Sequence, residues 1–198
     1  MNKKQLIESL RGERFNDKII NAFLKVPREK FIFKELEKFA YEDIALPLEF
    51  GATISQPHTI AFMLNLLELK KGYKILEIGS GCGYVLALLY EITKEEIYGI
   101  EVIRSLAEKS RKVLKNLRYA KIKVINKNGY FGLKEKAPFD RILISAASDK
   151  IPEHLYDQLN NGGIMVVPVR NSIFRIKKGK GRIESEEFPG FAFVPLIE

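Results

Sequence analysis

The sequence predicts an α/β domain built on a doubly wound, mostly parallel sheet. Between residues 75 and 168, short apolar segments of strand length alternate with segments of helical periodicity, which is the pattern of parallel strands joined by crossover helices. A glycine-rich segment at residues 79–83 follows the first of these strands and precedes a helix, as in a nucleotide-binding βαβ unit. Because the chain has 198 residues, it is long enough for one well-packed domain.

The N-terminal part is expected to be a helical extension. Apolar residues recur at helical spacing between residue 3 and about residue 37, first at Leu6, Ile7 and Leu10, and then at Ile19, Ile20, Phe23 and Leu24. Residues 40–58 contain two prolines and Gly51, so we expect an irregular loop, and a loop of this length is usually functional. We therefore predict a single domain over residues 1–198, with the helical extension and loop at 1–50 and the core with its C-terminal strands at 51–198.

The core elements are expected in regular order. The apolar segments predict strands at 75–78, 97–101, 122–125, 139–144 and 164–168, and the periodic segments predict helices at 58–67, around 85–89, at 104–117 and at 152–160. Residues 172–196 contain stretches of period two, at 172–176 and 191–194, so antiparallel strands should complete the sheet. The basic run at 177–182 is expected to be a hairpin turn between late strands.

The glycine-rich turn indicates a site for a small ligand, because such a turn brings bare backbone and a helix N-terminus close together. Its third glycine, Gly83, comes one residue earlier than the dinucleotide fingerprint requires, and Glu77 stands before the first glycine. Glu101 ends the next strand, where an acid can accept hydrogen bonds from both ribose hydroxyls. These features favour a nucleoside cofactor over an ordinary strand-to-helix turn. The pattern Glu-x-Gly-x-Gly-x-Gly resembles motif I of the class I S-adenosylmethionine-dependent methyltransferases.

The composition excludes several classes of protein. No run of about 18 apolar residues occurs, so we expect no segment to span a membrane. The single cysteine, Cys82, cannot form a disulfide within the chain, and no metal-ligand spacing is present, so we expect no metal and a reducing, cytoplasmic setting. The net charge of +8 is compatible with nucleic acid. Lysines and glutamates are interleaved, however, as in residues 34–38, which favours a solvated surface over nucleic-acid binding.

Further segments form a recognisable series along nearly the whole chain. They lie at residues 26–32, 40–43, 46–48, 51–58, 137–142, 151–152, 158–159 with 162–163, 167–169 and 193–196. The most specific is Gly-Ala-Thr-Ile-Ser-Gln-Pro-His at 51–58. The series resembles the protein-L-isoaspartate O-methyltransferases. The resemblance implies the Rossmann-like class I methyltransferase fold. It also implies an enzyme that transfers a methyl group from S-adenosyl-L-methionine to the free carboxylate of L-isoaspartyl residues in damaged proteins or peptides, leaving S-adenosyl-L-homocysteine.

The resemblance also assigns site residues. Ser55 is implied to be catalytic, its hydroxyl orienting the acceptor carboxylate, although Ser-Gln-Pro-His taken alone is more simply a cap of the following helix. The implied cofactor-binding residues are Thr53, Ser55, His58, Glu77, Gly79, Ser80, Gly81, Glu101, Asn128 and Gly129. Of these, residues 79–81 would lie along the methionine moiety, Glu101 on the ribose, and residues 128–129 at the adenine.

Two of these assignments have structural alternatives. His58 would either line the cofactor site or stand at the start of its helix. Glu77 would either contact the cofactor or satisfy backbone near the glycine turn.

The reaction implied by the resemblance needs no general base. A carboxylate acceptor has an ordinary pKa of about 4 and is ionised at neutral pH. Catalysis would then consist mainly of holding the acceptor oxygen in line with the methyl group while water is excluded.

The chain also departs from the family pattern. Asn128 stands where the family has an aspartate, and Arg170 stands where it has a glycine. The polar segment expected at 171–175 is not recognisable, and the C-terminal tail is short. Because this region holds the peptide in the family, two alternatives stay open: a diverged methyltransferase acting on another small carboxylate or on RNA, or a cofactor-binding protein without activity. The sequence gives no oligomeric state.

Overall fold

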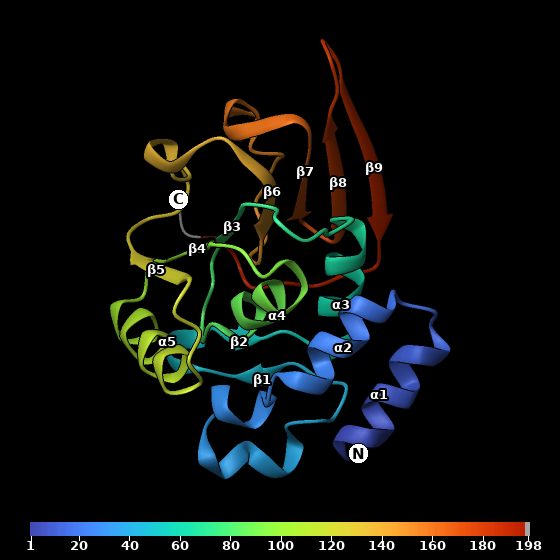
Figure 1. The fold of residues 1–198 in the computed structure, drawn as a ribbon, viewed down its shortest axis with the longest axis vertical. Helices are drawn as coiled ribbons and strands as arrows, with labels where there is room; N and C mark the ends of the chain where they lie inside the picture. Colours follow the sequence, from blue (N-terminus) through green and yellow to red (C-terminus); the bar gives the residue numbers. More distant parts are fainter. Residues whose placement is uncertain (197–198) are drawn as a thin grey trace.

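The fold is organised by a seven-stranded sheet in the order β5-β4-β3-β6-β7-β8-β9 (Figure 1). The structure is a computed structural model that describes residues 1–196. The strands are β3 (Ile75–Ile78), β4 (Ile97–Glu101), β5 (Ile122–Asn126), β6 (Phe139–Ile144), β7 (Leu159–Val169), β8 (Ser172–Lys178) and β9 (Ile183–Pro189). Strands β3 to β7 pair in parallel, and β8 and β9 extend the sheet by antiparallel pairing. The predicted mostly parallel sheet with antiparallel C-terminal strands is confirmed, except that residues 197 and 198 of the predicted core lie outside the described residues.

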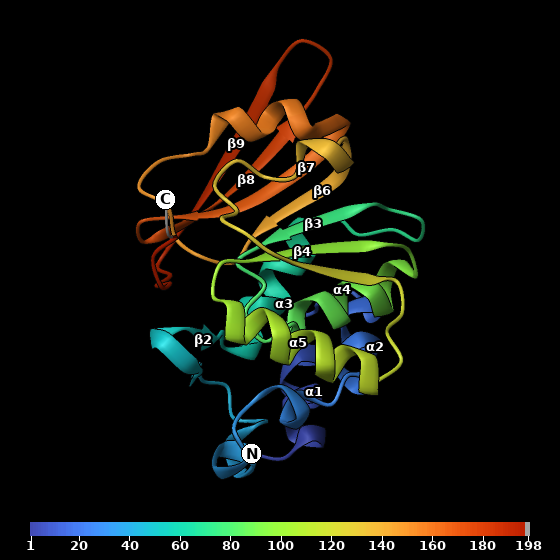
Figure 2. The ribbon, with the colours of Figure 1, turned by 90° about the vertical axis from the view of Figure 1, so that its left-hand side faces the viewer.

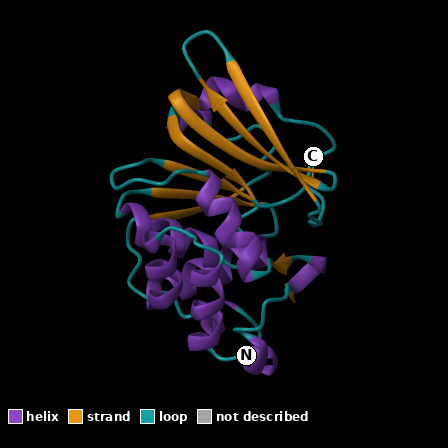
Figure 3. Ribbon diagram, turned by 90° about the vertical axis from the view of Figure 1, so that its right-hand side faces the viewer, coloured by secondary structure: helices purple, strands orange, loops and turns teal. Residues whose placement is uncertain are grey.

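Five α-helices lie on one side of the sheet (Figure 2). They are α1 (Lys3–Gly12), α2 (Asp17–Lys25), α3 (Pro57–Leu66), α4 (Tyr84–Thr93) and α5 (Arg104–Asn116). Short 3₁₀ helices connect the rest: η1 (Arg28–Phe31), η2 (Lys34–Phe39), η3 (Glu49–Gly51), η4 (Lys134–Lys136) and η5 (Glu153–Gln158). The last of these lies on the opposite face of the sheet. Figure 3 shows the same separation, with most of the helical segments gathered on one side of the strands.

The sheet buries apolar side chains on both faces, as a parallel sheet between two layers must. Ile75 and Ile97 face the helices, where they join one continuous apolar cluster with residues of α1 to α4 such as Leu6 and Leu86. The alternate strand residues, such as Leu76, form a second cluster with Leu155 of η5 on the other face. The two clusters hold β3 in the middle of the molecule, with every residue of the strand buried.

The strand order places a ligand crevice above β3. This strand pairs with β4 on one side and with β6 on the other, and both pairings are parallel. The chain runs from β3 to β4 and β5 on one side of β3 and then returns to β6 and β7 on its other side, so the order of the strands reverses beside β3. Ligands of open α/β sheets bind at such a switch point, beyond the carboxyl ends of the strands.

The helix predicted at 152–160 is observed only as the shorter 3₁₀ helix η5 (Glu153–Gln158). Leu159 already begins β7, where it pairs with Phe139 of β6. The Gln158 side chain turns inward, accepting from the Leu133 N–H at 2.8 Å and donating to the Phe131 carbonyl at 2.9 Å. The pairing of Leu159 with β6 and the hydrogen bonds of the Gln158 side chain therefore end the helical segment at Gln158.

The strand predicted at 191–194 is also not observed. The chain turns at Gly190, which has a φ of 96°, and leaves the edge of β9. Phe191 then stacks on Phe62 of α3, with ring centroids 5.3 Å apart, and only Pro195 makes an isolated bridge, with Ala147. The period-two pattern arises because alternate aromatic residues of an irregular segment are packed against the core.

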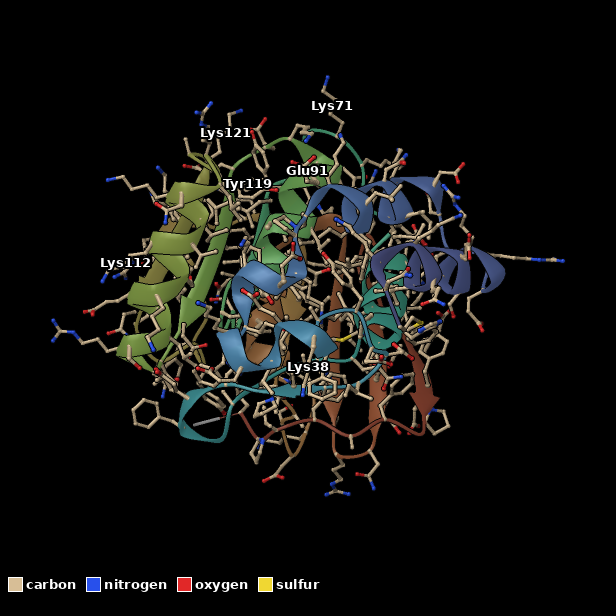
Figure 4. All side chains as sticks on the ribbon, turned by 90° about the horizontal axis from the view of Figure 1, so that it is seen from below. Lys38, Lys71, Glu91, Lys112, Tyr119 and Lys121 are labelled. Carbon is tan, nitrogen blue, oxygen red and sulfur yellow. The ribbon has the colours of Figure 1, made fainter. Side chains whose placement is uncertain are left out.

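The surface charge is dispersed on the face that carries the helices. Figure 4 shows Lys71, Lys112 and Lys121 extending away from the ribbon in different directions. Among residues 1–196, no helix is both long enough and apolar enough to cross a membrane.

Candidate active site

The glycine-rich turn is held at the carboxyl end of β3 by backbone hydrogen bonds to the neighbouring strand. The N–H groups of Gly79 and Ser80 both donate to the Ile100 carbonyl of β4, at 2.9 and 3.0 Å. Gly83 caps α4 with a φ of 85°, and a Cβ there would lie 3.2 Å from Ser110 of α5. This position therefore requires glycine for both its conformation and its close approach to α5. The turn presents the bare backbone of residues 79–81 to the crevice.

Glu101 ties the same turn to the end of β4. One carboxylate oxygen accepts from the Gly81 N–H at 2.7 Å, and the other accepts from the Ile103 N–H at 2.8 Å. Each oxygen keeps a further lone pair for a ligand hydroxyl. Asn126, at the end of β5, supports this arrangement by donating to the carbonyls of Glu101 and Val102. Sequence reasoning did not single out Asn126, because a strand-end amide carries no distinctive pattern.

Glu77 is a fully buried carboxyl group beneath the turn. One of its oxygens accepts a hydrogen bond from the Ser145 hydroxyl at 2.7 Å, and burial raises the pKa of Glu77 to about 8. The other oxygen has no partner among the described residues, nor has the buried hydroxyl of Ser80. The backbone role considered for Glu77 is not what the structure records, since its partner is a side chain. Ser145 was missed because the end of β6 carries no motif.

Residues 44–55, which we call the strap, cross over the glycine-rich turn. The strap contains a small antiparallel pair, β1 (Leu46–Pro47) and β2 (Thr53–Ile54), closed by η3. Leu48 covers Gly81, and Glu49 pairs with Lys109 and accepts from the Ser105 hydroxyl of α5. These contacts hold the segment that leads into Ser55 against the turn.

The strap and the turn together form a pocket of about 480 Å³, including the part open to solvent. Six of the predicted site residues line it: Thr53, Ser55, Glu77, Gly79, Ser80 and Gly81. The rest of the lining includes Met63, Ser145 and Phe193, which are separated by up to 130 residues in the chain. Two segments about 25 residues apart in sequence thus meet at the switch point of the sheet.

His58 does not line this pocket. It is the second residue of α3, and its backbone N–H donates to Asp43 at 2.9 Å. Its ring nitrogen Nδ1 lies 2.9 Å from the second oxygen of Asp43, and its other nitrogen lies 3.5 Å from the hydroxyl of Ser9. The side chain therefore points toward the N-terminal layer and ties the strap to the start of α3.

Asn128 and Gly129 follow the carboxyl end of β5, outside the lining of the pocket. Asn128 is exposed, and its side-chain oxygen accepts from the Tyr130 N–H at 2.8 Å. Gly129 is buried against the strand ends, where a Cβ would lie only 2.6 Å from Ile78. Arg170, another departure from the family pattern, is exposed and has a φ of 53°. This left-handed conformation explains why glycine suits that position.

Comparison with known proteins gives one consistent family. The family model described as protein-L-isoaspartate(D-aspartate) O-methyltransferase matches residues 1–198. A protein-L-isoaspartate O-methyltransferase of Methanothrix thermoacetophila is 42% identical over 202 residues, which cover 100% of this chain and 95% of that protein.

Two solved structures are similar over nearly all of the chain. One protein-L-isoaspartate O-methyltransferase has a TM-score of 0.91 and 29% identity over 98% of this chain, which spans 65% of the length of that one. A Plasmodium falciparum protein described under the same family name, in complex with S-adenosyl-L-homocysteine, has a TM-score of 0.86 and 28% identity, covering 100% of this chain and 99% of its own.

Proposed function

The chain belongs to the protein-L-isoaspartate(D-aspartate) O-methyltransferase family, and on that basis we propose how its residues carry out the methyl transfer. The fold is that of the class I S-adenosylmethionine-dependent methyltransferases. The enzyme transfers a methyl group from S-adenosyl-L-methionine to the free carboxylate of L-isoaspartyl residues in damaged proteins or peptides. The predicted family, fold and activity therefore agree with the relatives of the chain.

The pocket has the chemistry to hold this donor. Residues 79–81 offer bare backbone to the pocket that they line. The unpartnered oxygen of Glu77 and the unpartnered hydroxyl of Ser80 are buried polar atoms that a ligand would satisfy. When bound, the donor supplies an electrophilic methyl group on a sulfonium sulfur. We assign Glu77 to its cationic part, residues 79–81 to its methionine part, and Glu101 to its ribose.

The adenine is assigned to residues 128–129. Asn128 has its amide N–H groups free of any recorded bond, while its carbonyl is engaged with Tyr130. A side chain at Gly129 would collide with Ile78, so glycine is what lets the backbone approach the strand ends there. Thr53 and His58 are the remaining residues assigned to cofactor binding. Thr53 lines the pocket directly, whereas His58 acts indirectly, by holding the strap in place through its contact with Asp43.

Ser55 is the residue that orients the acceptor. Its side chain lines the pocket, and its hydroxyl makes no recorded hydrogen bond to another described residue. It is therefore available to donate to an acceptor carboxylate. Because that carboxylate is already ionised, the hydroxyl need not move a proton, and its contribution is to hold one oxygen in line with the methyl group. The meeting of Ser55 with residues 77–81 in one pocket is the observation that carries this proposal.

The substrate class is tested with radiolabelled S-adenosyl-L-methionine. The enzyme is incubated with an isoaspartyl peptide, its aspartyl twin and RNA, and label should enter the isoaspartyl peptide alone. Label in RNA alone would reject the repair function. Donor binding without label in any acceptor would instead indicate a cofactor-binding protein.

Replacing Ser55 with alanine tests its role. A hydrogen bond to a charged group contributes about 1.5–3 kcal/mol, so kcat/KM for the isoaspartyl peptide should fall by roughly 10- to 150-fold. Affinity for S-adenosyl-L-homocysteine, measured by calorimetry, should stay unchanged. The matched control is Ser55→Thr, which keeps the hydroxyl and should retain more activity than the alanine variant. Full turnover by Ser55→Ala would remove Ser55 from the mechanism.

Two further features of the chain bear on its partners and its setting. The dispersed lysines favour peptide over nucleic acid as the acceptor. The one cysteine, Cys82, is free, which fits a reducing, cytoplasmic compartment.

A further inference from the structure

Arg28 is a buried cation directly behind the pocket wall. It begins η1, has an exposed fraction of 0%, and is among the largest fully buried side chains. One terminal nitrogen donates to the Ser55 carbonyl at 3.0 Å, and the other donates to the Ile44 carbonyl at 3.3 Å. Its guanidinium carbon lies 5.4 Å from the ring centroid of Tyr84, which also lines the pocket.

The two carbonyls are the ends of the strap. The strap has little internal structure of its own, because β1 and β2 pair through only two residues each. A pair this short is at best marginally stable alone. Arg28 clamps both ends with one planar group, and so it fixes the peptide plane that carries the Ser55 side chain.

The burial of Arg28 is costly for the fold. Among residues 1–196, no carboxylate lies within salt-bridge distance of its guanidinium, although burial lowers its pKa and nearby Asp43 opposes that shift. The Asp43 oxygens are committed to His58 and Gln56. A buried charge without a paired charge is destabilising compared with an apolar side chain of similar size. A fold carries such a cost mainly where a functional group has to be held.

We infer that Arg28 is a positioning residue for the methyl transfer, acting through the backbone of Ser55 to set where the Ser55 hydroxyl points. The inference rests on the proposed role of Ser55. It assigns Arg28 no contact with the donor or the acceptor. Loss of the clamp should therefore impair the use of the acceptor and leave donor binding intact.

The test uses Arg28→Lys, which keeps the charge and loses the two-pronged geometry. Because small misplacements of a reacting group are costly, kcat/KM for the isoaspartyl peptide should fall by about tenfold to a hundredfold. The Kd for S-adenosyl-L-homocysteine should change by less than about twofold, because Arg28 makes no recorded contact with residues 79–81 or Glu101. Activity is expressed per mole of enzyme that binds S-adenosyl-L-homocysteine, so unfolded protein does not enter the ratio.

The chain offers a matched control in Arg141. It is also buried, at 4% exposed, and it also donates to backbone carbonyls, those of Leu67, Asp140 and Glu68. Its guanidinium carbon lies 4.3 Å from the Tyr73 ring centroid. It lies near the start of β6, beside the first residue of β3, whereas the pocket lies at the opposite, carboxyl ends of these strands. Arg141→Lys should lower the melting temperature without changing kcat/KM by more than about twofold.

A double-mutant cycle separates positioning from a general structural role. If Arg28 acts by aiming the Ser55 hydroxyl, then adding Arg28→Lys to Ser55→Ala should change kcat/KM by less than about twofold more. Multiplying effects in the double variant, or equal losses in Arg28→Lys and Arg141→Lys, would overturn the inference. A fully active Ser55→Ala enzyme would instead overturn the proposed role of Ser55, so the two failures are distinct.

Arg28→Gln is the second variant should Arg28→Lys not fold. It retains one amide donor for one of the two carbonyls, and it should show the same split between peptide kinetics and cofactor affinity. If neither variant folds while Arg141→Lys does, Arg28 determines the whole fold and not the site, and the inference is overturned.

Discussion

Replacing Glu77 with glutamine should stabilise the enzyme at neutral pH while weakening its hold on the donor. Glu77 is 1% exposed, and the only recorded partner of its carboxyl group is the Ser145 hydroxyl. Glutamine has nearly the same shape, and its carbonyl oxygen can accept the same hydrogen bond. The substitution therefore removes the titrating group with little change of packing.

The size of the effect follows from proton linkage. Burial raises the pKa of Glu77 from its ordinary value of 4.5 to about 8 in the folded protein. Between these values the folded protein keeps a proton that the unfolded chain has released, so the free energy of unfolding falls as the pH rises. Each pH unit costs about 1.4 kcal/mol, which amounts to about 4 kcal/mol between pH 5 and pH 8. Below pH 4.5 and above pH 8, Glu77 should add no further pH dependence.

Thermal unfolding of the two proteins at several pH values measures this difference. The melting temperature of Glu77→Gln should rise relative to the parent enzyme by roughly 8–16 °C between pH 5 and pH 8, since 1 kcal/mol shifts a chain of this size by about 2–4 °C. The exposed substitution Glu35→Gln is the control and should show no such trend. Parallel melting curves of Glu77→Gln and the parent across this range would refute the reasoning.

Calorimetry completes the test of Glu77. Above pH 8, where Glu77 is ionised, the donor should bind the glutamine variant roughly tenfold or more weakly, because a hydrogen bond from a cationic group to a carboxylate is lost. Unchanged donor affinity would show that the unpartnered oxygen of Glu77 does not face the donor.

Two further predictions concern backbone conformation. Gly129→Ala should lower the free energy of unfolding by about 1–3 kcal/mol, because the added methyl group would lie 2.6 Å from Ile78. The control is Gly12→Ala, whose methyl group meets nothing within 4 Å. Equal stability of the two variants in urea would contradict this prediction. Arg170→Gly should raise the free energy of unfolding by up to about 1 kcal/mol, because glycine adopts the left-handed conformation without strain. Arg170→Ala keeps the strained conformation and should not stabilise the protein. A gain in both variants would show that loss of the arginine side chain, and not relief of the backbone, is responsible.

The sequence alone determined the architecture of the core. The alternation of buried strands and amphipathic helices is a local pattern, and it placed β3 to β6 and α5 almost to the residue. The glycine-rich turn was also predictable, because Gly79, Gly81 and Gly83 all have positive φ angles, which glycine adopts more readily than other residues. Thr53, Ser55 and residues 77–81 were identified because they lie in short continuous motifs.

Only the tertiary structure determined the conformation of segments whose residues contact distant parts of the chain. The segment 152–160 has a helical pattern, yet Leu159 pairs with Phe139 in the sheet. Residues 191–194 alternate like a strand, yet Phe191 stacks on a helix far away in the sequence. His58 stands in the most specific motif of the chain, and only the position of Asp43 turns its ring away from the pocket.

The same reason explains the residues that sequence reasoning missed. Ser145, Asn126 and Arg28 act through hydrogen bonds to distant residues, among them Glu77, Glu101 and Ser55, which lie 68, 25 and 27 positions away. Such a bond depends on where two chain segments meet in space, and that meeting is fixed by the packing of the whole sheet and its helices. A local pattern carries information about its own secondary structure and burial, whereas the identity of a distant partner is set only when the fold is complete.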